Sequence, residues 1–320
     1  MNSRRARADE VAAWHDDGWV LLDGLIGADE VDAAAADLGE IFPTAEQYHA
    51  DPEGETERWR GRPPAPRADE YVWPAKGPGF RPEQHRWRAE FPFPGTGALN
   101  RLPVHPSIVD FMERVLETDD LRVYQTGMSA KYTGAANYEQ PMHTDRNHSW
   151  LPPRSELPWL HVESFLYLSD VGETYAPTHL VSVRDSVGRD PTVPLVFPQQ
   201  DPDLYDAERP AIGPRGSLLA YRPDVFHRGV DIVEPGGARF LMNVAYKRTG
   251  HDWIGFDTAQ SRASSPAWTK FVESSTPREL TLFGFPEPGH AVWNAALLVA
   301  TGEKYPNLDL APWRDGLANA

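Results

Sequence analysis

A histidine followed two residues later by a carboxylate occurs at four places in the sequence, a spacing that can put two metal ligands on one side of an extended segment. The pairs are His15 with Asp17, His49 with Asp51, His143 with Asp145, and His161 with Glu163. In a chain with 11 His, about one His-x-Asp pair is expected by chance, so the spacing alone does not identify a site.

The sequence around each pair indicates whether it is a candidate metal site or lies on the surface. The first lies at the end of a predicted helix and the second in a polar, proline-flanked loop, so we expect both on the solvated surface. The His161 pair lies on a predicted strand, where it forms either a packed polar pair or a set of ligands. The His143 pair follows a long predicted strand and a Gly/Asn turn, which predicts a position at the mouth of a barrel.

A third ligand is needed, and His227 is the best candidate. It follows the predicted strand 217–221 and precedes the turn at Gly236 and Gly237. Two His and one carboxylate on one face of a metal leave three positions open, which suits non-haem Fe(II). A lone His is more often structural, so the assignment depends on the next strand.

Residues 238–247 alternate in a way that predicts an inward-facing arginine. Period two puts Arg239, Leu241 and Asn243 on one face and apolar side chains on the other. An arginine inside a barrel needs an anionic partner, and its planar guanidinium suits a carboxylate. The alternative is an outward or salt-bridged Arg239.

Over residues 8–250, this set of residues resembles the phytanoyl-CoA dioxygenase family of Fe(II)/2-oxoglutarate oxygenases. The segments that carry the resemblance are DGWVLLDGL at 17–25, QTGMSAK at 125–131, QPMHTDRN at 140–147 and FLYLSDV at 165–171, followed by His227 and Arg239. The sequence departs from many relatives at 176–185, which reads APTHLVSVRD, and no hydroxyl residue follows His227 directly.

The resemblance implies a double-stranded β-helix (jelly-roll, cupin-like) core with flanking helices, and the use of Fe(II), 2-oxoglutarate and O2. It assigns His143, Asp145 and His227 as iron ligands and Arg239 as the contact to the far carboxylate of 2-oxoglutarate. Lys131 and Gln125, which share a strand face, are further predicted co-substrate contacts; the alternative for Lys131 is a surface lysine. Thr178 and Asn243 are predicted as helper donors beside Arg239.

The expected reaction is hydroxylation of a small metabolite or natural-product intermediate, with release of succinate and CO2. The loop 146–159 is expected to border the substrate, or to be a packed rim; its candidate contacts are Asn147, His148, Trp150 and Trp159. The aromatic-rich segment 71–93 is a candidate lid. Two other readings stay open: a cupin-like isomerase or dioxygenase that does not use 2-oxoglutarate, and a non-catalytic jelly-roll binding protein.

The elements that must position these residues are short strands, which lie between helical N-terminal and C-terminal parts of the chain. Helices are predicted at 9–17, at 28–41 with Asp29 as its cap, at 106–116 and within 266–298, with 291–300 the strongest part of the tail. Strands are predicted at 18–22, 121–132, 160–168, 194–197, 217–221 and 238–247. Short strands with long loops are typical of a jelly roll. We expect one domain, with an N-terminal part (1–120), a metal-binding core (121–250) and a helical C-terminal part (251–320).

Composition excludes several classes of site and partner. There is no cysteine, so disulfides, thiolate metal sites and cysteine nucleophiles are absent. A formal charge of −16 disfavours nucleic acid and anionic membranes as partners. Neither a signal peptide nor a membrane span is evident. We therefore expect a cytoplasmic monomer or homodimer whose partner is a small-molecule substrate.

Overall fold

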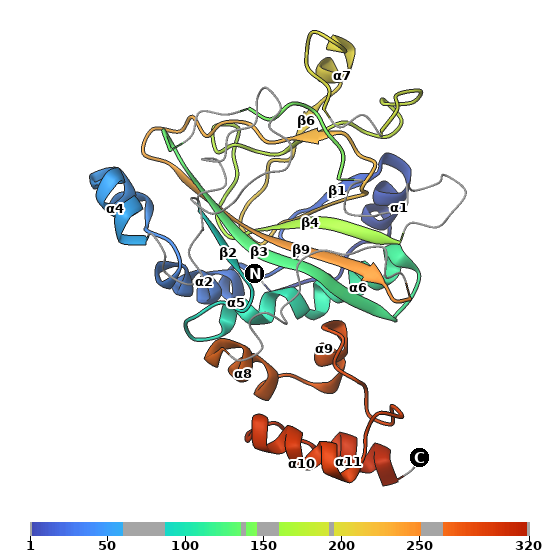
Figure 1. The fold of residues 1–320 in the computed structure, drawn as a ribbon. Coiled ribbons are helices and arrows are strands. Elements are labelled where there is room, and N and C mark those ends of the chain that lie inside the picture. The colour runs from blue at the N-terminus through green and yellow to red at the C-terminus, as the bar shows by residue number, and fades with distance from the viewer. Residues whose placement is uncertain are drawn as a thin grey trace.

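Two antiparallel sheets form the centre of the protein (Figure 1). The computed structural model describes residues 2–59, 87–135, 139–145, 160–191, 195–250 and 265–318. The larger sheet has the strand order β1-β7-β4-β9-β3-β2, and the smaller has the order β6-β5-β8. The strands of the larger sheet are β1 (Trp19–Leu22), β2 (Arg88–Glu90), β3 (Leu121–Tyr132), β4 (His161–Tyr167), β7 (Leu218–Tyr221) and β9 (Ala238–Arg248). Those of the smaller sheet are β5 (His179–Leu180), β6 (Arg209–Pro210) and β8 (His227–Arg228).

The two faces of the larger sheet are buried against different partners, because successive side chains of a strand point to opposite faces. On β9, Met242, Val244 and Tyr246 join the main hydrophobic core, whereas Leu241 packs in a second cluster with Leu180 of the smaller sheet. We call the second side the inner face. The predicted alternation of residues 238–247 is confirmed.

Helices cover the other face of the larger sheet (Figure 1). The amphipathic helix α6 (Pro106–Leu116) buries Ile108, Phe111 and Met112 in the main core, as its 3.6-residue periodicity predicts. Helix α1 (Ala8–Asp17) ends at Gly18, which has φ +82°. A Cβ at Gly18 would lie 2.7 Å from both Val183 and Val225, so this turn requires glycine.

The remaining helices lie mostly before β3 and after β9. They are α2 (Ala28–Ala35), α3 (Ala45–Ala50), α4 (Pro52–Trp59), α5 (Ala98–Arg101), α7 (Pro202–Asp206), α8 (Pro266–Glu273), α9 (Pro277–Leu282), α10 (Ala295–Lys304) and α11 (Ala311–Ala318), with 3-10 turns at Ala36–Glu40 and Leu102–Val104. None of the described helices is long and apolar enough to cross a membrane.

Two predicted helix starts and one predicted strand are wrong. Helix α2 is capped at Gly27, and Asp29 lies in its first turn, where a carboxylate interacts favourably with the helix dipole. The predicted strand 194–197 is reduced to one isolated bridge between Val196 and Met142 in its described part. In the C-terminal part, α10 begins at Ala295 with Asn294 as its cap, so residues 291–294 are not helical.

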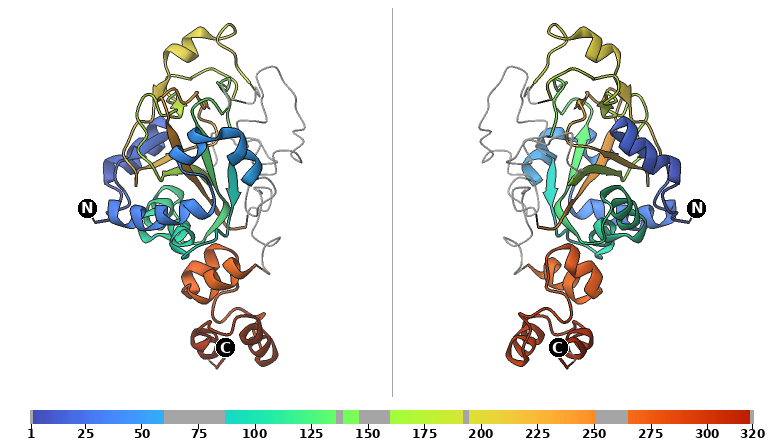
Figure 2. Two further views of the ribbon diagram at one scale, coloured as in Figure 1. Left: turned by 90° about the vertical axis from the view of Figure 1, so that its left-hand side faces the viewer. Right: turned by 90° about the vertical axis from the view of Figure 1, so that its right-hand side faces the viewer.

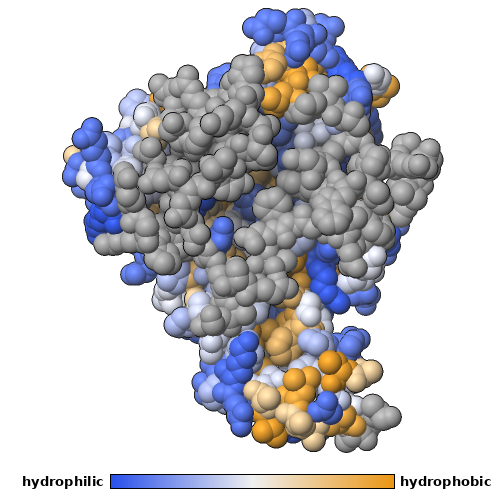
Figure 3. Space-filling view, in the orientation of Figure 1, coloured by the Kyte–Doolittle hydropathy of each residue, from blue (hydrophilic) through white to orange (hydrophobic). Residues whose placement is uncertain are grey.

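Helices α8 to α11 extend from the end of the molecule opposite α7 (Figure 2). Apolar residues gather on the surface of this part (Figure 3), and Val292, Val299 and Leu317 are exposed there. The aromatic side chains of Tyr305 and Trp313 are buried within this part.

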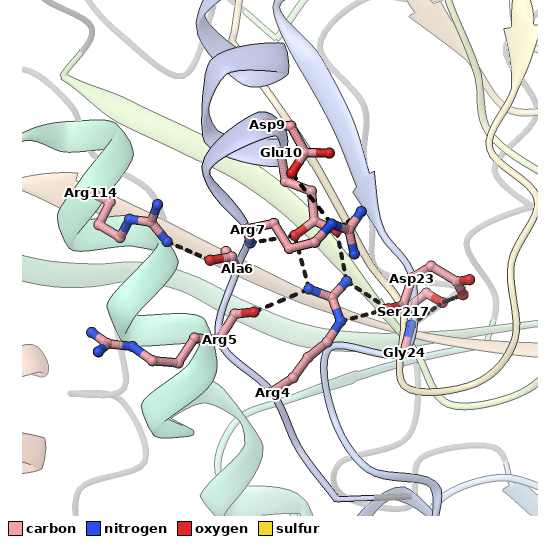
Figure 4. A network of polar contacts seen from close by, with 10 residues as sticks. All are labelled: Arg4, Arg5, Ala6, Arg7, Asp9, Glu10, Asp23, Gly24, Arg114 and Ser217. Carbon is pink, nitrogen blue, oxygen red and sulfur yellow. Dashed lines mark hydrogen bonds and ion pairs between the residues drawn. The ribbon is translucent and has the colours of Figure 1, made fainter.

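The N-terminal segment is held by a network of ion pairs (Figure 4). Arg4 donates to both carboxylate oxygens of Glu10, at 2.8 and 2.7 Å, and to the backbone oxygen of Asp23 at 2.7 Å. Arg7 approaches Glu10 at 2.8 Å. Glu10 is buried, so two arginines neutralise a carboxylate that would otherwise be costly to bury.

Candidate metal centre

An isolated antiparallel bridge brings the first and third predicted ligands together. The backbone N–H of His143 donates to the oxygen of His227 at 3.0 Å, and the N–H of His227 donates to the oxygen of His143 at 2.9 Å. Residues directly opposed across such a bridge have neighbouring side chains. The two imidazole rings lie 4.4 Å apart between centroids.

Asp145 completes a group of three side chains that could hold a metal ion. One ligand atom from each of His143, Asp145 and His227 lies within 4.8 Å of the others. The His227 Nε2 and Asp145 Oδ2 atoms are 3.4 Å apart. Across the described ranges no other group of three or more His, Asp and Glu side chains meets this criterion.

The first two His–carboxylate pairs have structural surroundings. His15 is exposed, and Asp17 lies 3.3 Å from Arg184. The prediction that His49 lies in an exposed loop is wrong: it lies in helix α3 and is half-buried, with Nε2 3.1 Å from the backbone oxygen of Gly237. Asp51 accepts the backbone N–H of Gly54 at 2.9 Å.

Both imidazoles are oriented by backbone carbonyls. His143 Nδ1 lies 2.9 Å from the oxygen of Pro141, and His227 Nδ1 lies 3.0 Å from the oxygen of Val225. A carbonyl accepts only, so each Nδ1 carries a proton and each Nε2 of the neutral ring keeps its lone pair for a metal. Burial, and then the nearby His227, lowers the pKa of His143 to about 4 and keeps that ring neutral.

A tyrosine orients the carboxylate. The Tyr221 hydroxyl donates to Asp145 Oδ2 at 2.8 Å. Burial, and next the charge of Asp145, raises the pKa of Tyr221 well above its usual value, so the phenol stays protonated and donates. The Tyr221 ring also lies 4.7 Å from the ring of His227, so one side chain contacts two of the three predicted ligands.

Two cations lie side by side at one end of the inner face. Lys131 and Arg239 are register partners on β3 and β9. Arg239 is buried and donates through Nη1 to the backbone oxygen of Ala176, but its Nε is buried with no hydrogen-bond partner in the described part of the chain. Lys131 Nζ donates to the backbone oxygen of Val230 at 2.8 Å.

The cations have perturbed pKa values because both are desolvated. Burial lowers the pKa of Arg239 to about 10, which leaves it charged at neutral pH. Burial, and then the charge of Arg239, lowers the pKa of Lys131 to about 7. Neither forms an ion pair with a carboxylate among the described residues. An anionic group bound here would relieve both costs.

The other predicted co-substrate contacts are distributed over the inner side. Thr178 is buried two residues after Ala176, whose oxygen accepts from Arg239. Asn243 is on the same face of β9, opposite Gly127. Gln125 is opposite Ala245 and therefore six residues along β9 from Arg239. The structure thus does not place Gln125 beside Arg239.

The predicted substrate contacts lie outside the described residues. These are Asn147, His148, Trp150 and Trp159. Most of the candidate lid, residues 71–86 of 71–93, also lies outside them.

Sequence reasoning missed Tyr221 as a partner of Asp145. The alternation of the predicted strand 217–221 placed Tyr221 and Leu219 on one face, and that was the available signal. The contact itself joins residues 76 positions apart, which no local pattern specifies.

Comparison with known proteins identifies the fold through solved structures alone. The chain matches no protein-family profile and no curated protein sequence. It is similar to the non-heme alpha ketoglutarate dependent carbocyclase SnoK from nogalamycin biosynthesis, with a TM-score of 0.53 and 15% identity over 82% of this chain and 93% of that chain. It is also similar to the non-heme alpha ketoglutarate dependent epimerase SnoN from nogalamycin biosynthesis, with a TM-score of 0.50 and 16% identity over 75% and 80% of the two chains.

Proposed function

We propose that this protein is an Fe(II)- and 2-oxoglutarate-dependent oxygenase, and that its two sheets form a double-stranded β-helix within a single domain. The observation that carries the proposal is the convergence of His143, Asp145 and His227, with ligand atoms within 4.8 Å of one another. Two imidazoles and one carboxylate fit a non-haem Fe(II) site with open positions for co-substrate and O2. The fold shared with two alpha ketoglutarate dependent enzymes supports it.

Four residues of the candidate metal centre have distinct roles in this proposal. His143 and His227 present Nε2 to the metal, because backbone carbonyls accept from Nδ1. Tyr221 holds Asp145 so that one carboxylate oxygen stays available. Iron bound by these residues supplies the activation of O2 coupled to decarboxylation of 2-oxoglutarate.

Arg239 and Lys131 would bind the far carboxylate of 2-oxoglutarate. Arg239 offers a buried donor, Nε, that no described residue uses, and a guanidinium pairs with a carboxylate through two parallel hydrogen bonds. Lys131 adds a second positive charge from the neighbouring strand. Thr178 and Asn243 are the proposed helper donors.

The proposed reaction is hydroxylation of a small metabolite or natural-product intermediate, with release of succinate and CO2. The names of the two similar structures state a carbocyclase and an epimerase from a natural-product pathway, which supports a natural-product substrate. We propose that Asn147, His148, Trp150 and Trp159 contact it.

Anaerobic addition of Fe(II) and then 2-oxoglutarate to the full chain tests the proposal. We expect a visible metal-to-ligand charge-transfer band, lost in His227→Ala and retained in the matched surface variant His15→Ala. On admission of O2, succinate should form. Metal binding without a band, with turnover indifferent to 2-oxoglutarate, would support a cupin-like enzyme instead. Failure to bind any divalent metal would support a binding protein.

A further inference from the structure

A row of inner-face residues crosses the larger sheet at the end away from Arg239. Gln125 of β3 is opposite Ala245 of β9, and Glu163 of β4 is opposite Tyr221 of β7. The pairing of Val162 with Tyr246 puts Glu163 level with Ala245. The row therefore reads Gln125, Ala245, Glu163, Tyr221, and its smallest side chain lies between the amide and the carboxyl.

A β-bulge adds a fourth polar side chain to this row. The register between β3 and β9 shifts between Val123 and Gln125, so Tyr124 is the extra residue. Bulges next to active sites re-aim side chains. The Tyr124 hydroxyl donates to Glu163 Oε1, and the Tyr124 ring lies 5.7 Å from that of His161. The bulge thus directs Tyr124 to the same side as Gln125.

Burying these groups is costly for the fold. Glu163 is 2% exposed and His161 is 3% exposed. Burial raises the pKa of Glu163 to about 8. The Gln125 Oε1 atom is buried and accepts no hydrogen bond from the described part of the chain. An unsatisfied buried acceptor destabilises a protein, and Leu219 and Leu241 on the same face show that apolar residues fit there.

One residue of the row contacts the candidate metal centre, and the row lies away from the cationic end. Tyr221 belongs to the row and its hydroxyl reaches Asp145. Arg239 is six residues along β9 from Ala245, which is about 20 Å at 3.4 Å per residue. A co-substrate carboxylate at Arg239 would leave this end of the inner face for a different molecule.

We propose that Tyr124, Gln125, His161 and Glu163 form the end of the substrate site, and that they bind a hydrogen-bond-donating group, a hydroxyl or an ammonium, of the substrate. Gln125 Oε1 and the Glu163 carboxyl are the acceptors, and the small side chain of Ala245 lies between them. Calling the bound molecule the substrate rests on the proposed oxygenase function. The binding of a donor group there does not.

The test uses three small probes that share one ring: cyclohexanol, cyclohexylammonium and cyclohexanecarboxylate. Their affinities for the full chain are measured by ligand-observed NMR before any metal is added, so a failure of the iron chemistry leaves the result intact. We expect binding of the alcohol or the ammonium in preference to the carboxylate. Gln125→Leu combined with Glu163→Gln should weaken that binding about tenfold, since each change alters one acceptor.

The control is Thr126→Val combined with Ser164→Ala. These residues are the chain neighbours of Gln125 and Glu163 and point to the opposite face, where the Ser164 hydroxyl donates to the oxygen of Val244. This variant should bind the probes like wild type. Gln125→Leu alone serves if the double variant does not fold, because its Oε1 has no partner to lose within the described part of the fold.

The pH dependence separates the two donor groups. Affinity for cyclohexylammonium that rises between pH 6 and 9, and no longer does so in Glu163→Gln, identifies an ammonium site. Preference for cyclohexanol at both pH values identifies a hydroxyl site. The proposal is overturned if no probe binds, if the carboxylate binds best, or if Gln125→Leu binds the probes as tightly as wild type.

Discussion

Replacing Tyr221 with phenylalanine removes one hydroxyl and keeps the ring that packs against His227. The hydroxyl donates to Asp145 Oδ2 at 2.8 Å, and the same oxygen lies 3.4 Å from His227 Nε2. Without the phenol, the carboxylate can rotate away from the position in which it faces the two imidazoles. We expect Tyr221→Phe to bind Fe(II) more weakly while the fold is retained.

The magnitude follows from the kind of bond that is lost. A hydrogen bond to a charged group contributes about 1.5–3 kcal/mol. Outer partners of metal ligands typically change metal affinity by roughly 10- to 100-fold when they are removed. At about 1.4 kcal/mol per decade the two ranges agree, so the Fe(II) dissociation constant should rise roughly 10- to 100-fold.

Anaerobic titration of Fe(II), followed by competition with a chelator, measures this dissociation constant. Tyr167→Phe is the matched control: Tyr167 is also a buried tyrosine on the inner face, but its hydroxyl donates to the oxygen of Ala211 at 2.8 Å. Equal Fe(II) affinities in Tyr221→Phe and wild type would refute the orienting role. An equal loss in both variants would point to a general effect on the sheet.

Three other predictions follow from the same geometry. Alanine at any one of the three predicted ligands should abolish iron-dependent succinate formation, whereas His49→Ala should retain it; near-wild-type succinate release at limiting iron would remove that residue from the ligand set. Arg239→Ala should weaken 2-oxoglutarate binding roughly 30-fold to several-thousand-fold, for a loss of about 2–5 kcal/mol, as read from titration of the charge-transfer band; an unchanged affinity would mean that another cation anchors the carboxylate. Burial lowers the pKa of Lys131 to about 7, whereas a lysine in the unfolded chain has a pKa of about 10.4. Between these pH values the folded protein binds fewer protons than the unfolded chain, so its free energy of unfolding rises with pH. Without 2-oxoglutarate, Lys131→Met should therefore raise the free energy of unfolding more at pH 7 than at pH 10 in denaturant titrations, and an equal difference at both pH values would contradict this reasoning.

The parts of the fold that the sequence predicted well are those with a strong local period. The long strands around Gln125 and Arg239, and the amphipathic helix α6, were placed within a residue or two. The strand at 194–197 was wrong because a short apolar run does not specify a partner, and Val196 has one bridge only. The helix predicted at 291–300 begins at Ala295 because the side chain of Asn294 caps its first turn.

The candidate site was predictable where chemistry restricts the residue type. Two His and one carboxylate, followed by an inward Arg239, leave few alternatives once the strands are known. The outer partners were not predictable, because Tyr221 reaches Asp145 through strand pairing between distant segments. The bulge at Tyr124 was not predictable either, because nothing in the sequence around Tyr124 distinguishes it from a regular strand residue.

The pairing of β1 with β7 sets the order in which this chain can be completed during translation. Trp19 is opposite Tyr221, so the two strands are separated by about 200 residues, and β1 lies at the edge of the sheet. At about 5–20 residues per second, roughly 10–40 s pass before the ribosome has made the partner of β1. The contacts of Arg4 with Glu10 and Asp23 are all local and can form within that interval, whereas β1 has no neighbouring strand until then. The N-terminal helix and strand would thus wait as a small preassembled unit. The arrival of β7 would join β1 to β4, and β9, which is made last, would then link β4 to β3 and complete the sheet.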